Sequence, residues 1–135
     1  ELAKAQKSQG ADVIYAAAGG TGIGVLQAAA DEGILSIGVD SNQNYLHPGQ
    51  VLTSMLKRVD VAVYNAFKTG TDLQPGVTLL DLKAEGVGYA LDENNASLIT
   101  PEMKAAVDAA DEKIKSGELV VHNYTTDDTC PAATF

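Results

Sequence analysis

The sequence contains no tryptophan, one cysteine and few aromatic residues, which make up 5% of its 135 residues. Cys130 cannot form a disulfide within the chain and has no histidine or asparagine context that would make it a nucleophile. His47 and His122 stand alone, so no spacing predicts a metal site. No apolar run reaches membrane-spanning length. We therefore expect neither catalysis nor a bound metal or cofactor.

Basic residues are also scarce: 9 Lys and Arg stand against 18 Asp and Glu, giving a net charge of −9. Such a chain repels a phosphate backbone, which excludes nucleic acid as a partner. The length suits one domain. The first six residues begin inside an amphipathic helical pattern without an initiator Met or a signal peptide, so we expect the chain to be a piece of a longer protein.

Residues 12–40 organise the rest of the sequence. An apolar run over 13–18 predicts a buried parallel strand, and a helical repeat from Gly22 to Gly33 predicts a helix. A second apolar run over 34–39 ends at Asp40. Parallel α/β sheets bind ligands at the carboxyl edge of their strands. This stretch therefore predicts a small-ligand site, or half of one.

The remaining elements continue the alternation of strands and helices. They are a helix over 1–9, strands over 51–56 and 77–82, a helix opened by Lys57 and Arg58, an extended segment over 86–91, a helix over 101–116 and an edge strand over 118–121. We expect Met103, Val107 and similarly spaced residues to form a buried stripe on the last helix. The alternation predicts an α/β fold with a mostly parallel sheet.

The glycine turn allows two interpretations. GGTGIG, with Asp40 about twenty residues further on, resembles the dinucleotide fingerprint, but its last glycine comes one position too early. An NAD-dependent oxidoreductase is therefore one alternative.

The other interpretation needs no pyrophosphate. Asp40 can accept two hydrogen bonds from a cis-diol, and the backbone at Gly19 and Gly20 admits a ligand because these residues lack a side chain. Tyr15 can offer a ring face to a planar base, and Lys57 can reach a second hydroxyl. Tyr15 as a packing residue and Lys57 as a solvated charge are the structural alternatives.

Three segments together resemble the basic membrane protein family of substrate-binding lipoproteins of ABC importers, and in particular its purine nucleoside receptors. They are GADVIYAAAGGTGIGVLQAA, IGVDSNQNYLHPGQVLTSMLKRVDVAVYNA and GVGYALDENNASLITPEMKA. The resemblance covers Gln9 to about Val121. It implies a type I periplasmic-binding-protein fold, in which two α/β lobes close over a ligand.

The resemblance assigns residues 1–121 to the C-terminal portion of such a protein, including segments that cross between lobes, and residues 122–135 to a tail. It implies that Tyr15 stacks on a nucleobase and that Asp40 and Lys57 contact ribose. Gly19 and Gly20 match the backbone turn beside the ligand. The N-terminal lobe and the lipidated cysteine are expected outside this chain.

The resemblance thus implies a nucleoside-binding component that works with an ABC permease and ATPase. Its expected location is periplasmic or on the cell surface, anchored in the membrane through a lipidated N-terminus. A nucleoside sensor built on the same fold stays open as an alternative. The apolar stripe of the helix after Lys57 would lack its normal partner in the isolated chain, so we expect a homodimer or larger assembly, formed through a stripe of Val59, Ala62, Val63, Ala66 and Phe67.

Overall fold

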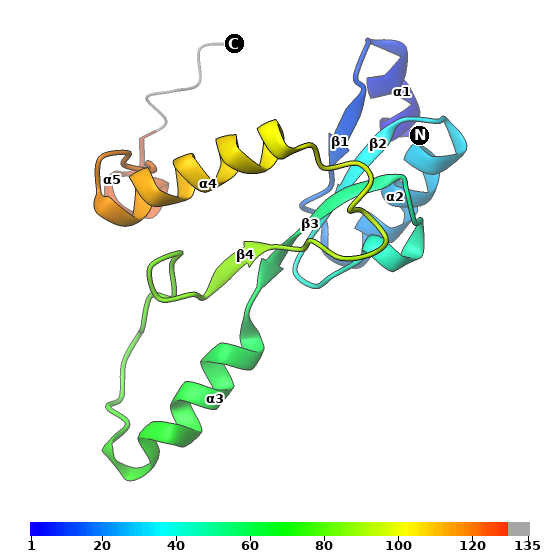
Figure 1. The fold of residues 1–135 in the computed structure, drawn as a ribbon. Coiled ribbons are helices and arrows are strands. Elements are labelled where there is room, and N and C mark those ends of the chain that lie inside the picture. The colour runs from blue at the N-terminus through cyan, green and yellow to red at the C-terminus, as the bar shows by residue number, and fades with distance from the viewer. Residues whose placement is uncertain (130–135) are drawn as a thin grey trace.

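The computed structural model describes residues 1–129, in which one sheet has the strand order β1-β2-β3-β4 (Figure 1). Strands β1 (Val13–Tyr15), β2 (Leu35–Gly38) and β3 (Val51–Lys57) are parallel. Strand β4 (Val87–Tyr89) pairs antiparallel with the end of β3. The predicted α/β fold with a mainly parallel sheet is therefore confirmed. Cys130 and the last part of the predicted tail lie outside the described residues.

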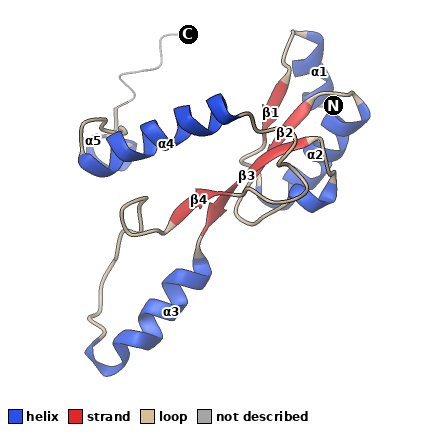
Figure 2. Cartoon of the chain, viewed as in Figure 1, coloured by secondary structure: helices blue, strands red, loops and turns tan. Residues whose placement is uncertain are grey.

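Helices and short 3-10 turns connect the strands (Figure 2). Helix α2 packs on β1 and β2, and α1 packs against α2. Helix α3 extends away from the sheet where β3 ends, and α4 lies on the other side of the sheet from α2. The bounds are α1 (Leu2–Ser8), η1 (Gly19–Thr21), α2 (Gly22–Asp31), η2 (Asn44–Leu46), α3 (Val59–Thr69), η3 (Gly70–Asp72), α4 (Pro101–Ser116) and α5 (Tyr124–Asp127).

The apolar core lies between α2 and the parallel strands. Leu26 and Ala29 are fully buried on one face of α2, and Ile14 and Val51 are buried in the strands beneath. Gly22 begins α2 so close to the preceding turn that a Cβ there would lie 3.3 Å from the carbonyl oxygen of Ala16. The predicted strand over 13–18 accordingly ends at Tyr15, because the chain turns before it enters the helix.

Helix α4 has the predicted ends but not the predicted burial. The Oγ1 atom of Thr100 accepts a hydrogen bond from the backbone N–H of Met103 at 3.2 Å, and Gly117 ends the helix with a φ of +83°. Met103 and Val107 are nevertheless 44% and 45% exposed. The predicted buried stripe is wrong for the described chain, because α4 leaves an open groove above β3 and β4 instead of closing onto them.

Two predicted strands are absent from the described residues. Residues 77–82 and 118–121 form no strand, and Val77 and Leu79 expose their side chains to solvent. An apolar pattern specifies which side chains seek burial, but a strand also needs a neighbour with which to exchange backbone hydrogen bonds. The predicted extended segment over 86–91 shortens to β4, and Lys57, predicted to open a helix, ends β3 instead.

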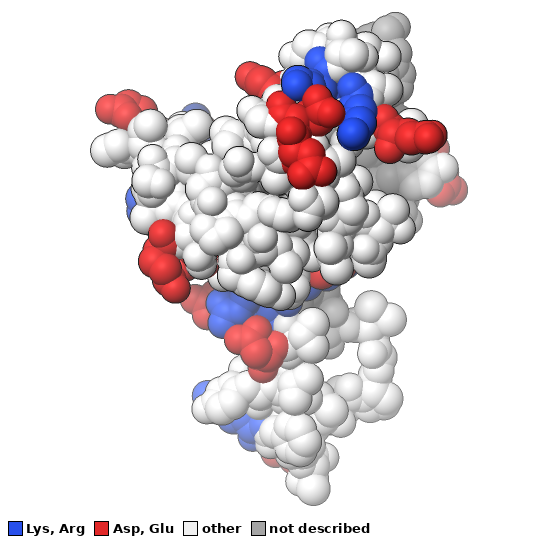
Figure 3. All heavy atoms as spheres, turned by 90° about the vertical axis from the view of Figure 1, so that its right-hand side faces the viewer, with Lys and Arg blue, Asp and Glu red and all other residues white. Residues whose placement is uncertain are grey.

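Helix α3 exposes the apolar stripe that the sequence places on one of its faces. Val59, Val63 and Phe67 are 63%, 49% and 83% exposed. Figure 3 shows much of this end of the molecule as uncharged, with some acidic and basic side chains, and it shows a larger group of acidic and basic side chains at the opposite end. At that opposite end Lys7 of α1 pairs with Glu32 at 2.9 Å. The described residues therefore leave the α3 stripe without a packing partner, as expected.

No helix within residues 1–129 is both long enough and apolar enough to span a membrane.

Candidate functional site

The five residues singled out from the sequence lie at the ends of neighbouring parallel strands or in the turn that follows β1. Tyr15 ends β1 and pairs with Ile37 of β2, and Lys57 ends β3. Asp40 follows β2, and Gly19 and Gly20 open the turn before α2. Parallel pairing brings these strand ends to one edge of the sheet. We call Tyr15, Gly19, Gly20, Asp40 and Lys57 the edge site.

Asp40 and Lys57 form the closest contact within the edge site. The Nζ atom of Lys57 lies 2.7 Å from Oδ1 of Asp40, and the two side chains are 60% and 47% exposed. The hydrogen bond to Asp40 raises the pKa of Lys57 above its usual value, and the negative charge of Asp40 adds to this effect. An exposed ion pair contributes little to folding stability. Its two charged groups instead remain accessible to a ligand.

The backbone at Asp40 has an uncommon conformation. Its φ is +69°, and the N–H of Ser41 donates to the carbonyl of Val39 at 2.9 Å across it. These features define a tight γ-turn of the rare form with positive φ. Residues other than glycine are held in such conformations only when the surrounding structure enforces them, and they concentrate at functional sites.

Tyr15 and the glycine turn complete the edge site. Tyr15 is 49% exposed, so part of its ring is open to solvent. Tyr15 also raises the pKa of Lys57 electrostatically, although less than Asp40 does. A Cβ added to Gly20 would meet nothing within 4 Å, and the backbone of Gly20 does not have a positive φ. The described structure itself therefore does not require glycine at this position.

A second group of residues was missed by the sequence analysis. Polar residues from the loop after β2, from β3 and from the loop after β4 are linked by hydrogen bonds. We call this group the polar cluster, and its members are Asn42, Gln43, Asn44, Ser54, Asp92 and Asn95. Asn44, Ser54 and Asn95 are fully buried. Buried polar groups need hydrogen-bond partners. Ser54 donates to Asn44, and the side chain of Asn95 bonds to backbone groups.

Ser54 and Asn95 connect the polar cluster to the sheet. The Ser54 hydroxyl donates to Oδ1 of Asn44 at 2.8 Å and accepts from the N–H of Gln43 at 3.0 Å. The Nδ2 atom of Asn95 donates to the carbonyls of Leu52 and Ala90 at 2.9 and 3.0 Å. Asn95 begins a triplet that matches the glycosylation acceptor pattern, but its amide is buried and occupied. Buried hydrogen bonds of Ser54 and Asn95 thus hold the loops after β2 and β4 against β3.

Asp92 gives the polar cluster a dependence on pH. A hydrogen bond from Nδ2 of Asn42 lowers the pKa of Asp92 below its usual 3.8, and the N–H of Asn94 assists. A lowered pKa in the folded state contributes stability that is present above pH 3.8 and is lost as the pH falls through the folded value.

We therefore expect the melting temperature of Asp92→Asn to lie below that of the unmodified protein at pH 7, and the difference to shrink below pH 3.8. Circular dichroism melting curves between pH 2.5 and 7 measure this difference in melting temperature. Glu93→Gln, at the neighbouring exposed position, is the matched control and should show no such convergence. A difference that stays constant across the range would contradict the role given to Asp92.

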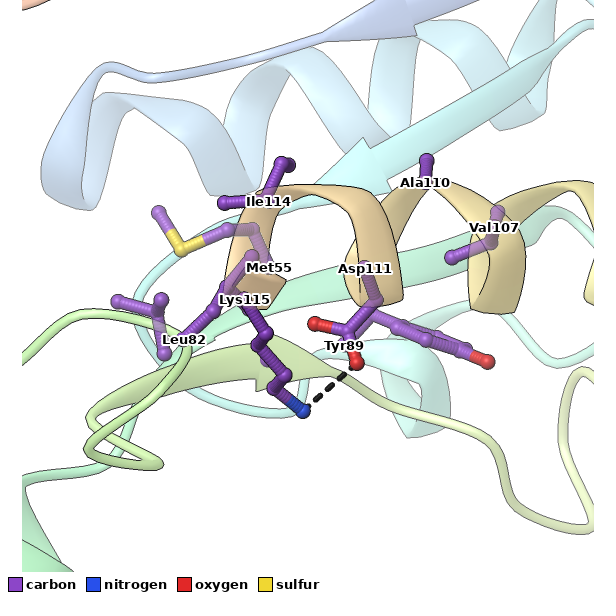
Figure 4. A pocket seen from close by; sticks show the side chains of 10 residues that line it. Met55, Leu82, Tyr89, Val107, Ala110, Asp111, Ile114 and Lys115 are labelled. Atoms are coloured by element: carbon purple, nitrogen blue, oxygen red, sulfur yellow. Dashed lines mark hydrogen bonds and ion pairs between the residues drawn. The ribbon is translucent and has the colours of Figure 1, made fainter. Parts of the chain in front are cut away.

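A separate groove lies beneath α4 (Figure 4). Met55, Tyr89, Val107 and Ile114 contribute apolar surface to it, and Asp111 pairs with Lys115 on the same helix at 2.7 Å. None of the edge-site residues lines this groove. Across residues 1–129, no group of three or more His, Cys, Asp and Glu side chains is placed to hold a metal ion.

Comparison with known protein families shows to which family this sequence belongs. The model of the Bmp family, described as ABC transporter substrate-binding protein PnrA-like, matches residues 1–125. The chain belongs to this family. The family resemblance seen in the sequence is thereby confirmed, and the matched residues include the whole edge site and the whole polar cluster.

Individual relatives agree with the family assignment. Basic membrane protein D of Borreliella burgdorferi strain JD1 is 46% identical over 92 residues, covering 63% of this chain and 27% of that protein. A protein of Pyrococcus abyssi named an uncharacterized lipoprotein is 33% identical over 149 aligned positions, covering 83% of this chain and 37% of that protein. The chain thus spans well under half the length of these curated relatives.

Solved structures share the fold. An ABC transporter system solute-binding protein from Aeropyrum pernix K1 superposes with a TM-score of 0.70 at 28% identity, over 94% of this chain and 45% of that chain. A protein described as a transcriptional activator of the comK gene from Bacillus halodurans has a TM-score of 0.78 at 23% identity, over 90% of this chain and 42% of that chain. At that identity the second likeness concerns the fold alone.

Proposed function

We propose that the intact protein is the solute-binding component of an ABC importer and that it binds a purine nucleoside or a similar ribosyl compound without catalysis. The observation that carries the proposal is the Asp40–Lys57 pair, a 2.7 Å contact of two half-exposed charged groups at the ligand edge of the sheet in a member of this family. Such a pair offers a vicinal diol both an acceptor and a donor of charge-assisted hydrogen bonds.

The neighbouring residues support the same ligand class. The half-exposed ring of Tyr15 can stack on a planar base while Asp40 holds the sugar. Open space beside Gly19 and Gly20 admits a ligand close to the backbone. Because base stacking and diol binding occur at adjacent strand ends, a ribonucleoside engages both at once, whereas a free sugar or a free base engages only one.

The wider role follows from the family. We propose that the protein delivers its ligand to a permease and ATPase complex and acts outside the cytoplasm, held at the membrane by a lipidated N-terminal segment not included in residues 1–135. Relatives named lipoproteins in three Pyrococcus species support the anchor. The family description supports the importer.

Thermal-shift measurements on the intact protein test the ligand class. Adenosine and guanosine should raise the melting temperature, since a ligand at a hundredfold excess over its Kd stabilises the native state by ~2.7 kcal/mol. Ribose, adenine and NADH are the comparison ligands. A shift with NADH but not with nucleosides would replace the proposal by the dinucleotide-dependent alternative.

We expect Tyr15→Phe to bind adenosine like the unmodified protein and Tyr15→Ala to lose ~1–3 kcal/mol of binding free energy, because the ring face rather than the hydroxyl group contacts the base. Isothermal titration calorimetry measures both variants. Tyr45→Ala, which removes a tyrosine that is 65% exposed in the loop before β3, is the control. Equal losses for Tyr15→Phe and Tyr15→Ala would assign the contact to the hydroxyl group and contradict stacking.

We also propose that the 135-residue chain, expressed by itself, forms a dimer or a larger assembly through the exposed α3 stripe. Burying Val59, Val63 and Phe67 against a second copy removes apolar surface that a soluble monomer seldom exposes. Light scattering at micromolar concentration should give at least twice the monomer mass, and Phe67→Lys should reduce it. Leu2→Lys, on the distant α1, should not. A monomeric unmodified chain would contradict this proposal.

A further inference from the structure

The turn at Asp40 needs support from outside itself. Asp40 is not a glycine, yet its φ of +69° lies in the left-handed region, which side chains disfavour. The single hydrogen bond across the turn, from Ser41 to Val39, joins its two flanking residues and does not connect it to the rest of the fold. The carboxylate can therefore hold one direction only if neighbouring elements fix the backbone on both sides of the turn.

Gln43 fixes the backbone before the turn. Its Oε1 atom accepts a hydrogen bond from the N–H of Val39 at 2.9 Å, so the side chain reaches back across the turn from three residues beyond Asp40. Its own N–H donates to the buried hydroxyl of Ser54 at 3.0 Å. Gln43 is thus held by β3 while it holds Val39 at the end of β2.

Close packing leaves the Gln43 side chain little freedom. A Cβ added to Gly38 would lie 2.8 Å from Oε1 of Gln43 and 2.6 Å from Oγ of Ser54, so glycine at this position makes room for both groups. After the turn, the carbonyl of Asp40 accepts from the N–H of Lys57 at 2.9 Å. Strand β3 therefore supports the turn at two points, through Ser54 with Gln43 and through Lys57.

We infer that Gln43 is a positioning residue of the proposed nucleoside site. Its side chain, lodged against Gly38 and fastened to Ser54, holds the turn so that the Asp40 carboxylate faces Lys57 and the ribose hydroxyls. The ligand in this inference rests on the proposed function. The part of the inference that concerns Asp40 and Lys57 does not depend on the ligand, because it follows from the contacts of Gln43 with Val39 and Ser54.

Matched variants at Gln43 test the inference in the intact protein. Gln43→Met keeps the length of the side chain but removes the acceptor for the Val39 N–H, and Gln43→Glu keeps that acceptor. Gln50→Met is the control, because Gln50 lies at the opposite end of β3 and its buried Oε1 has no protein partner in the described residues. Calorimetric titration with adenosine and with 2′,3′-dideoxyadenosine separates the diol contact from the rest of the site.

Gln43→Met should lower the affinity for adenosine by about tenfold or more, by analogy with groups that orient the ligands of a metal ion, and leave the affinity for dideoxyadenosine within about twofold. Gln43→Glu should recover most of the loss, and Gln50→Met should bind both nucleosides normally. Equal losses for the two nucleosides would overturn the inference, because they would indicate a general structural defect.

A second measurement needs no ligand. The pKa of Lys57 is raised because Asp40 is in place, so its side-chain NMR signals report the position of the carboxylate. Gln43→Met should return that pKa toward the usual 10.5, whereas Gln50→Met should not. If the intact protein binds no nucleoside, the proposed function fails while this titration still decides the inference, and an unchanged Lys57 pKa overturns it.

Ser54→Ala provides a second variant should Gln43→Met not fold. It removes the hydroxyl group that fastens Gln43 to β3, together with the hydrogen bond from this hydroxyl to Asn44. Ser54→Ala should change the adenosine affinity and the pKa of Lys57 in the same direction as Gln43→Met, by a smaller amount. If both stay unchanged, the inference is overturned.

Discussion

Replacing Asp40 by alanine is expected to reduce the nucleoside affinity of the intact protein by about 2–4 kcal/mol, because a bound ribose diol then loses two charge-assisted hydrogen bonds. Calorimetric titration with adenosine and guanosine measures the loss. The 2′,3′-dideoxy analogues should bind the variant and the unmodified protein with similar weakness, since they lack the hydroxyls that Asp40 contacts in our proposal. Unchanged adenosine binding would remove Asp40 from the site.

Asp40→Asn separates the loss of the negative charge from backbone strain at this position, and Asp12→Ala is the control. Alanine disfavours the φ of +69° at Asp40, whereas asparagine tolerates it more readily. Asp40→Asn should therefore keep the turn and lose only the charge, with a smaller loss of affinity than Asp40→Ala. Asp12→Ala, which removes an exposed carboxylate just before β1, at the opposite edge of the sheet, should leave nucleoside binding unchanged.

The largest loss of stability is expected for Asn95→Ala. Asn95 is fully buried, and its side chain satisfies the carbonyls of Leu52 and Ala90 and the N–H of Asp92. Alanine would remove three hydrogen bonds to backbone groups, of which the carbonyl of Ala90 keeps another, from Oγ1 of Thr53. It would also open a small cavity, so we expect the free energy of unfolding to fall by about 3–5 kcal/mol.

Urea denaturation of the 135-residue chain followed by circular dichroism measures this loss. Asn65→Ala makes the same chemical change at an exposed position on α3 and should alter the free energy of unfolding by less than about 0.5 kcal/mol. A loss at Asn95 no larger than that at Asn65 would show that the polar cluster does not stabilise the fold.

Local signals predicted those parts of the fold that local interactions determine. The apolar runs before the glycine turn and before Asp40 predicted β1 and β2, and the helical pattern over 101–116 predicted α4. The adjacency of Asp40 and Lys57 at one edge of the sheet also followed, because both come at or just after the ends of apolar runs and parallel strands align their carboxyl ends.

The remaining parts depend on contacts between distant segments. Residues 77–82 have the apolar pattern of a strand but no neighbour among the described residues, so pattern alone misassigned them. Asn42 and Asp92 bond at 2.6 Å although fifty residues separate them. Read separately, their two loops are typical surface turns. Only the Asn and Asp residues gathered in both loops, each next to an apolar strand, were a signal that the loops face one another.

In the function that we propose, stability and recognition are carried by different side chains. Asn44, Ser54 and Asn95 are buried and fasten the loops, whereas the side chains of Asp40, Lys57 and Tyr15 are about half exposed. Substitutions at the exposed positions can therefore accumulate during evolution without unfolding the chain. A lineage that retains the buried amides is free to exchange Tyr15 or Lys57 and acquire a different ligand on the same scaffold.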